Sequence, residues 1–296
     1  MSVDAIPMGP SARWTDFLEL TKPRITSMVA LTTAAGFLLT APRPLDWIVL
    51  VHALLGTALV ASGASTLNQV IERGTDARMR RTANRPLPAG RLQPETALLF
   101  GITISLLGIS YLALVVNVLT AVVGAATLGL YVCVYTPMKR RSSVSTLVGA
   151  IPGAMPPMMG CTAASGELGA EAWILFGILF LWQMPHFLAI AWLYRSDYER
   201  GGFPLLALGH LPGVRTARQM VLYSAALIPV SLLPTVLGFT GSTYFIGAAA
   251  LGLVFLAYSF GFGLSQNAPA ARRLLLASVV YLPIVLLLMV ADTTMR

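Results

Sequence analysis

Nine long apolar runs dominate this sequence and limit what the chain can fold into. An α-helix needs about 20 apolar residues to cross a hydrocarbon core of about 30 Å. Charged residues make up only 11% of the chain, whereas a soluble globular protein has about 25%. The sequence therefore predicts an all-α polytopic membrane protein, with spans at residues 25–41, 47–71, 95–115, 117–136, 146–163, 172–194, 217–238, 243–264 and 274–291.

The basic residues predict how these spans are oriented. Of the 20 Lys and Arg residues, 18 lie in an N-terminal arm and in four of the connecting segments, which are residues 1–24, 72–94, 137–145, 195–218 and 265–273. Because Lys and Arg are retained on the cytoplasmic side, we expect the N-terminus in the cytoplasm and the C-terminus outside. A bacterial inner membrane is the simplest compartment. The bases form short clusters between apolar runs, so nucleic-acid binding is not expected.

Three oxygen-bearing side chains mark the end of the second span. Asn68, Glu72 and Asp76 follow one another at four-residue spacing, which places them on one face of an α-helix over about 12 Å. Two carboxylates and an amide suit Mg²⁺ held together with water and substrate phosphates. A polar helix end that merely faces water is the alternative, but polar groups at a membrane edge are functional candidates by default.

An arginine-rich segment follows this stripe at once. Guanidinium groups bind phosphate oxygens in pairs, and no glycine-rich nucleotide-binding loop occurs in the chain. The combination favours a lipid diphosphate over a nucleotide. The arginines of this segment are Arg78, Arg80, Arg81, Arg85 and Arg91.

The fourth span ends in a second group of polar side chains. Tyr131, Tyr135 and Lys139 also stand at four-residue spacing. Aromatic faces stabilise cations, and an ammonium group can hold a departing diphosphate. An interfacial tyrosine belt beside cytoplasmic charge is the alternative interpretation.

The sixth span contains polar residues around a proline. Gln183 and His186 flank Pro185, which interrupts the backbone hydrogen bonds of a helix. They either line a cavity and contact a ligand or are hydrogen-bonded core residues. Asp197 follows the span on the same predicted side as Asp76, and is a candidate carboxylate for the metal site.

The Asn68–Glu72–Asp76 pattern resembles the first Asp-rich motif of the UbiA superfamily of intramembrane prenyltransferases. Six further stretches, in order along the chain, resemble the same superfamily and within it the branch that acts on haem. They are LTKPRI (residues 20–25), MRRTANRPLPAG (79–90), YTPMKR (135–140), GAIPGAMPP (149–157), WQMPHF (182–187) and Asp197-Tyr198 with Gly202.

The resemblance implies one membrane-embedded domain over residues 1–296, with a ring of helices around a central cavity. Segments 72–94, 137–145 and 195–218 would form the active-site loops. The implied donor is farnesyl diphosphate, the acceptor is haem B, the product is haem O and the cofactor is Mg²⁺. Membrane lipid and a haem A synthase or oxidase-assembly protein are the other implied partners.

The resemblance also implies roles for individual residues. Asn68, Glu72, Asp76 and Asp197 would hold Mg²⁺. Lys139 and the two tyrosines would act in catalysis, with Tyr131 and Tyr135 sheltering an allylic cation. Gln183 and His186 would contact haem. The expected diphosphate-binding residues are Lys22, Arg24, Arg85, Lys139 and Arg140.

The chain departs from the superfamily pattern at two positions. Gly74 stands where a further Asp is common, and Gly201 stands where the second Asp of a DxxxD motif would lie. Three other functions remain open: a UbiA-type enzyme with an aromatic quinone-precursor acceptor, a secondary transporter, and a haem carrier without chemistry. The stretch WQMPHF argues against a quinone-precursor acceptor. The acids lie at one membrane face, which argues against a transporter, and the arginine–carboxylate segment argues against a haem carrier.

Overall fold

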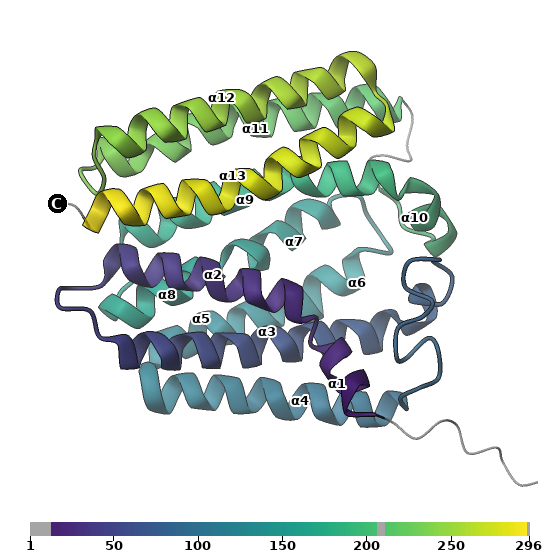
Figure 1. Ribbon diagram of the computed structural model, residues 1–296. Helices are drawn as coiled ribbons and strands as arrows, with labels where there is room; N and C mark the ends of the chain where they lie inside the picture. The colour runs from purple at the N-terminus through teal and green to yellow at the C-terminus, as the bar shows by residue number, and fades with distance from the viewer. Residues whose placement is uncertain (1–12, 206–210, 295–296) are drawn as a thin grey trace, which may run out of the picture.

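The computed structural model describes residues 13–205 and 211–294, and these residues form helices and no strands (Figure 1). Expectations for residues 1–12, 206–210 and 295–296 lie outside the described residues. The predicted all-α fold class is confirmed. In chain order the helices are α1 (Trp14–Leu20), α2 (Pro23–Thr40), α3 (Trp47–Asp76), α4 (Pro94–Tyr111), the π-helix η1 (Leu112–Val116), α5 (Val118–Gly129), the π-helix η2 (Leu130–Tyr135), α6 (Thr136–Met138), α7 (Ser145–Ala154), α8 (Pro156–Ser165), α9 (Ala170–Leu193), α10 (Arg195–Gly201), α11 (Pro212–Val236), α12 (Ser242–Ser265) and α13 (Ala268–Thr294).

Seven helical segments in the described part of the chain are long and apolar enough to cross a membrane. They are α3, α4 with η1, α5 with η2 and α6, α9, α11, α12 and α13. The other two predicted spans correspond to α2, with 18 residues, and to α7 and α8, with 10 residues each. The count of nine spans and the sidedness of the termini therefore stay predictions.

The predicted fifth span, residues 146–163, is two short helices. Pro156 has no N–H to donate, so it starts a new helix more readily than it continues one. The backbone N–H of Met155 bonds the carbonyl of Pro152 at 3.4 Å and closes α7. The chain then enters α8, which packs on α2, α3, α5 and α9.

Glycines let α2 and α8 approach until their backbones touch. A Cβ atom at Gly36 would lie 2.1 Å from the carbonyl oxygen of Pro157, and one at Gly160 would lie 1.9 Å from that of Thr33. The hydroxyl of Thr33 donates to the carbonyl of Pro156 across the same contact, at 3.1 Å. Small residues are the usual means by which membrane helices pack this closely.

The helix contacts close on themselves and form a ring. α2 packs on α3, α3 on α5 and η2, η2 on α7, α7 on α9, α9 on α13, and α13 again on α2. α4 packs outside this ring on α3, and α11 and α12 pack outside it on α9 and α13 (Figure 1). The outer helices expose large apolar side chains such as Leu99, Leu106 and Leu253, which suits contact with lipid.

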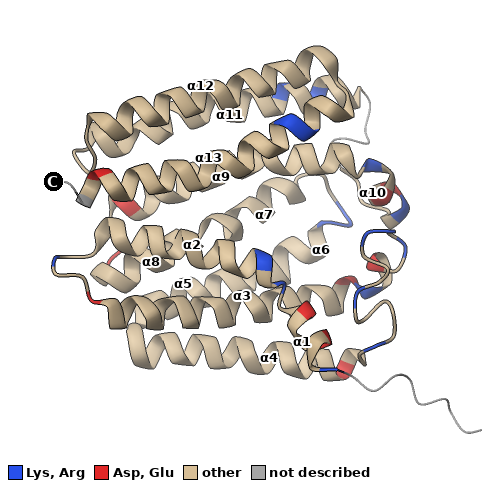
Figure 2. Cartoon of the chain, viewed as in Figure 1, with Lys and Arg blue, Asp and Glu red and all other residues tan. Residues whose placement is uncertain are grey.

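Charged side chains gather at the ends of the helices and leave their middle parts uncharged (Figure 2). Most Lys and Arg lie at the end that carries α1, α10 and the connection between α3 and α4. The connection between α2 and α3, which contains Arg43, lies at the opposite end. One end of the ring is therefore strongly basic.

The contact between α2 and α8 can be tested with two alanine substitutions. Gly160→Ala places its Cβ against backbone, which cannot move aside as a flexible side chain could, and we expect a loss of about 1–3 kcal/mol in stability. Gly261→Ala on α12 is the control, because no atom lies within 4 Å of the added Cβ. Thermal unfolding of the detergent-purified protein should show a lower Tm for Gly160→Ala only. Equal Tm values for the two variants would contradict the close contact.

Candidate active site

The predicted stripe on α3 lines a polar cavity of about 140 Å³ at the basic end of the ring. Asn68, Glu72 and Asp76 lie on the last turns of α3 and are between 1% and 4% exposed. The helix continues to Asp76, five residues beyond the predicted end of the span, so all three side chains project from one rigid element. The residues around this polar cavity are Lys22, Asn68, Glu72, Asp76, Met79, Arg81, Thr82, Arg85, Tyr131, Lys139, Tyr198 and Phe203.

Cations from three other segments meet the side chains of the stripe. Lys139, just after α6, is 2.7 Å from Glu72 Oε1 and 3.0 Å from Oε2. Arg85, in the connection between α3 and α4, donates to Asp76 Oδ2 at 2.7 Å. The ammonium of Lys22 lies 3.5 Å from Asn68 Oδ1. A buried carboxylate is stable only when paired, so these contacts explain how two acids can lie inside the protein.

The polar cavity holds more positive than negative charge. Four basic side chains and two acidic ones line it. Burial, together with repulsion from Arg85 and Lys139, lowers the pKa of Lys22 to about 7. Lys22 also has a left-handed backbone with φ of 48° just before Pro23, a conformation that is uncommon for a residue with a side chain. An anionic ligand would relieve the repulsion among these cations.

The stripe has oxygen atoms available for a divalent cation. Asp76 Oδ1 is buried without a hydrogen-bond partner among the described residues, although Oδ2 of the same carboxylate binds Arg85. No group of three or more His, Cys, Asp and Glu that could hold a metal occurs in the described chain. The amide and the two carboxylates of the stripe are oxygen donors, the ligand type that Mg²⁺ prefers, and Mg²⁺ commonly completes its coordination with waters and substrate phosphates.

The predicted tyrosines lie on a π-helix where an α-helix was expected. Pro137 cannot donate a backbone hydrogen bond, and both the amide and the hydroxyl of Thr136 bond the carbonyl of Tyr131. The ring centroids of Tyr131 and Tyr135 are 5.3 Å apart, and the ammonium of Lys139 lies 5.1 Å from the Tyr135 ring centre. The π-helix brings together the residues that the α-helical spacing predicted as one group.

An apolar cavity of about 260 Å³ continues from the tyrosine pair toward the opposite end of the ring. It shares Tyr131 with the polar cavity. Its walls come from six elements of the ring and from α8. The lining residues are Ile25, Val29, Thr57, Val60, Ala61, Ala64, Ser65, Thr127, Tyr131, Tyr135, Gly149, Pro152, Gly153, Pro156, Met159 and Phe187.

A third cavity, of about 180 Å³, lies between η2, α7, α9 and α10. It shares Tyr135 and Phe187 with the apolar cavity, and Lys139 and Arg81 with the polar cavity. The three cavities therefore meet around the two tyrosines and Lys139.

Asp197 lies outside the polar cavity and has partners of its own. Its carboxylate accepts a hydrogen bond from the backbone N–H of Arg80 at 3.3 Å and pairs with Arg200 on the next turn of α10. Burial by itself would raise the pKa of Asp197, but these hydrogen bonds hold it below its usual value. Asp197 lines none of the three cavities and fastens the connection between α3 and α4 to α10. Its role as a metal ligand stays a prediction.

Arg24 and Arg140 also lie outside the polar cavity. Arg24 is exposed on the first turn of α2. The guanidinium of Arg140 bonds the hydroxyl of Thr75 on α3. Of the expected diphosphate-binding residues, the structure brings Lys22, Arg85 and Lys139 together in the cavity.

Gln183 and His186 bond neighbouring helices. Gln183 donates to the carbonyl of Ala150 on α7 at 2.7 Å. His186 Nδ1 lies 2.7 Å from the hydroxyl oxygen of Ser278 on α13, and its ring stacks on Trp182. Neither side chain lines the three cavities, although Phe187 lines two of them. Their contact with haem stays a prediction.

Arg81 and Tyr198 line the site, but neither is among the residues to which the resemblance assigned an individual role. The guanidinium of Arg81 lies over the rings of Tyr194 and Tyr198, and donates to the Tyr198 hydroxyl at 3.3 Å. Both residues line the polar and the third cavity. Arg81 stands in the stretch MRRTANRPLPAG and Tyr198 follows Asp197, so both were within motifs that the resemblance used.

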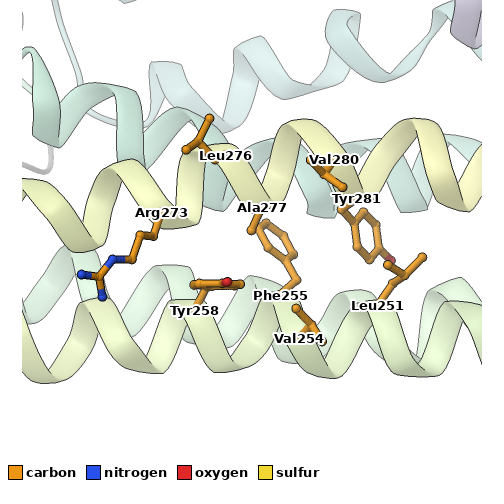
Figure 3. Close-up of a pocket in the computed structure, with 9 residues that line it drawn as sticks. All are labelled: Leu251, Val254, Phe255, Tyr258, Arg273, Leu276, Ala277, Val280 and Tyr281. Atoms are coloured by element: carbon orange, nitrogen blue, oxygen red, sulfur yellow. The ribbon is translucent and has the colours of Figure 1, made fainter.

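A groove of about 350 Å³ between α12 and α13 is separate from this site (Figure 3). Its lining residues come only from these two helices and are apolar apart from Arg273 and the two tyrosine hydroxyls. It shares no residue with the three cavities.

The fold and the site define a membrane-embedded helical protein with a cation- and carboxylate-lined cavity that opens into an apolar one, and comparison with known proteins identifies its family. The UbiA prenyltransferase family model matches residues 29–282. The chain belongs to this family.

Named relatives cover nearly the whole chain. It is 48% identical over 286 residues to a protoheme IX farnesyltransferase of Solibacter usitatus, covering 94% of this chain and 98% of the relative. The mitochondrial protoheme IX farnesyltransferase of Homo sapiens is 41% identical over 271 residues, covering 92% of this chain and 60% of the relative.

Solved structures share the fold at low sequence identity. A digeranylgeranylglyceryl phosphate synthase superposes with a TM-score of 0.81 and 16% identity, over 95% of this chain and 99% of the other. A UbiA homologue of Archaeoglobus fulgidus, bound to GPP and Mg²⁺, superposes with a TM-score of 0.66 and 16% identity, over 94% and 99% of the two chains.

The two interpretations of Asp197 predict different outcomes for Asp197→Asn. If Asp197 fastens the connection between α3 and α4, the variant should exchange the backbone amide of Arg80 faster, because it loses a charged acceptor. Its affinity for Mg²⁺ with a prenyl diphosphate should remain near that of the wild type. Hydrogen exchange and a Mg²⁺ titration measure the two effects. Unchanged exchange with weakened Mg²⁺ binding would show that Asp197 is a metal ligand instead.

Proposed function

We propose that this chain transfers the farnesyl group of farnesyl diphosphate to a vinyl group of haem B, and that addition of water completes haem O. The observation that carries the transfer reaction is the meeting of the polar and apolar cavities at Tyr131. A prenyl diphosphate needs one compartment for its charged end and another for its hydrocarbon chain. The choice of farnesyl and haem rests on the names of the relatives.

The cations of the polar cavity bind the diphosphate. Lys22 immediately precedes α2, Arg85 lies in the connection after α3, and Lys139 immediately follows α6. Charge-assisted hydrogen bonds from ammonium and guanidinium groups to phosphate oxygens are among the strongest in proteins. When the allylic C–O bond breaks, the diphosphate leaves with the electron pair, and these cations stabilise the added charge.

Asn68, Glu72 and Asp76 would hold Mg²⁺, with Asp197 as a further proposed ligand. The unpartnered Oδ1 of Asp76 supports this assignment. When bound, Mg²⁺ neutralises charge on the diphosphate oxygens and so makes departure of the leaving group easier. The pairs that Glu72 and Asp76 form with Lys139 and Arg85 also support the assignment, because the proposed metal ligands then lie beside the cations proposed to bind the diphosphate.

The tyrosine pair stands where the carbon cation forms. Tyr131 and Tyr135 present aromatic rings at the mouth of the apolar cavity, and ring faces attract cations. The vinyl group of haem attacks the allylic carbon and forms the new C–C bond. The cation then lies on the carbon next to the porphyrin ring, where water adds and loses a proton. No strong base is required.

The third cavity is the approach that we propose for the acceptor. It reaches Tyr135 from the side of α7 and α9, and so leads to the same place as the apolar cavity. Arg81 and Lys139 line it and provide positive charge for the haem propionates. An aromatic quinone precursor is the alternative acceptor, and a direct comparison of the two acceptors decides between them.

The protein is a multi-pass membrane protein by its seven candidate spans. We propose the bacterial inner membrane, with the basic end and the polar cavity toward the cytoplasm, because Lys and Arg are retained on that side. Farnesyl diphosphate would enter from the lipid phase. A haem A synthase or oxidase-assembly partner is retained as a prediction of the resemblance.

The metal site is tested with Asp76→Asn. Loss of an anionic ligand should lower the rate of haem O formation by about 100-fold or more. Asp46→Asn is the matched control, because Asp46 caps α3 at its other end and Asn is an equally good cap. Purified protein is incubated with haem B, farnesyl diphosphate and Mg²⁺, and the product is weighed by mass spectrometry. Near-normal activity in a folded Asp76→Asn variant would remove the stripe from the mechanism.

The proposed haem contact of His186 is tested by spectroscopy. The hydroxyl of Ser278 donates to the carbonyl of Leu275 at 2.6 Å, so Nδ1 of His186 is the donor toward Ser278 and Nε2 keeps its lone pair. Such a nitrogen can ligate iron. His186→Ala should change the Soret spectrum and weaken haem binding, with farnesyl diphosphate affinity preserved. A lower Tm with unchanged haem binding would show that His186 only joins α9 to α13.

A further inference from the structure

The apolar cavity is closed at the end that lies away from the diphosphate site. Thr57, Val60 and Met159 line that end and are only 1–2% exposed. Near the tyrosine pair, by contrast, the cavity is lined by Ile25, which is 57% exposed. A prenyl chain whose diphosphate lies in the polar cavity therefore meets a buried wall at its far end.

The position of this wall along α3 sets the room for a prenyl chain. From Ser65, on the cavity wall, to Thr57 is eight residues, or about 12 Å of α-helix, and from Glu72 to Thr57 is about 22 Å. The second distance covers the diphosphate site and the chain together. The cavity is thus a compartment of fixed depth.

Met159 is the part of the wall that a single substitution can remove. It projects from α8, whose backbone is held against α2 at Gly36 and Gly160. On the other side of its side chain lies Gly124 of α5, where a Cβ would be 3.0 Å from Met159 Cε and 3.4 Å from the fully buried Leu112. The thioether therefore fills the space between the cavity and the bare backbone of α5.

From this arrangement we infer that Met159, supported by Gly124, limits the length of the prenyl group that the protein accepts. The inference rests on the proposed function, since it concerns the same donor site. A prenyl group with one more five-carbon unit than farnesyl would have to displace the side chain of Met159 from its position against α5. A single methylene in an apolar pocket changes discrimination by about 10–200-fold, so a five-carbon unit gives ample discrimination.

Three variants test this role. Met159→Ala deepens the compartment, and should raise affinity for the geranylgeranyl (C20) donor relative to the farnesyl (C15) donor by about tenfold or more. Met158→Ala is the matched control, because Met158 is the neighbouring residue on α8, is also buried and does not line the cavity. Gly124→Ala presses on Met159 Cε and should lower affinity for the farnesyl donor more than for the geranyl (C10) donor.

The measurement is the dissociation constant of each prenyl thiolodiphosphate, which binds without ionising, for the purified full chain with Mg²⁺. The wild type should prefer the C15 analogue over the C20 analogue by at least about tenfold. The inference is overturned if the wild type binds both equally, or if Met159→Ala and Met158→Ala shift the ratio alike. Binding of the analogues needs no haem. If the protein shows the expected ratios of dissociation constants but does not farnesylate haem, the proposed acceptor is refuted and the role of Met159 is not.

Discussion

The pairing of two buried carboxylates on α3 with cations from distant segments is the interaction on which the site depends. Glu72 binds Lys139 and Asp76 binds Arg85. Removing one partner of such a pair leaves an uncompensated buried charge, at a cost of about 3–5 kcal/mol. The end of α6 and the connection after α3 are therefore held in place around the stripe. The polar cavity is the space that remains between these pairs.

A change of helix type joins this charged compartment to an apolar one. The π-helix η2 places Tyr131 on the boundary of both cavities and Tyr135 beside Lys139. π-helical turns within α-helices occur often at functional sites. Beyond the tyrosines, the contact of α8 with α2 closes the apolar cavity. The same few elements thus set a charged cavity and an apolar cavity side by side, as the proposed reaction requires.

The sequence predicted the shared face of the stripe because that arrangement is local. Asn68, Glu72 and Asp76 lie on one helix, and a fixed rise and rotation per residue determines which side chains share a face. Asp197 and His186 were harder, because a carboxylate or an imidazole binds whichever partner the fold brings near. In the folded chain, Asp197 accepts a hydrogen bond from the backbone amide of Arg80, and His186 forms a hydrogen bond with the hydroxyl of Ser278. The arginine pattern likewise could not show that Arg81 lies over Tyr194 and Tyr198.

By itself, the sequence determined that the chain is an all-helical membrane protein and that one helix end carries a stripe of oxygen-bearing side chains. Both follow from apolar length and from helical period, which are local properties. Only the tertiary structure decided which cations bind the stripe, where α8 closes the apolar cavity, and which side chains line the closed end of that cavity. Those outcomes depend on contacts between segments far apart in the chain, such as Gly160 with Thr33 and Met159 with Gly124. No spacing along the sequence encodes such distances, because they arise from the packing of whole helices.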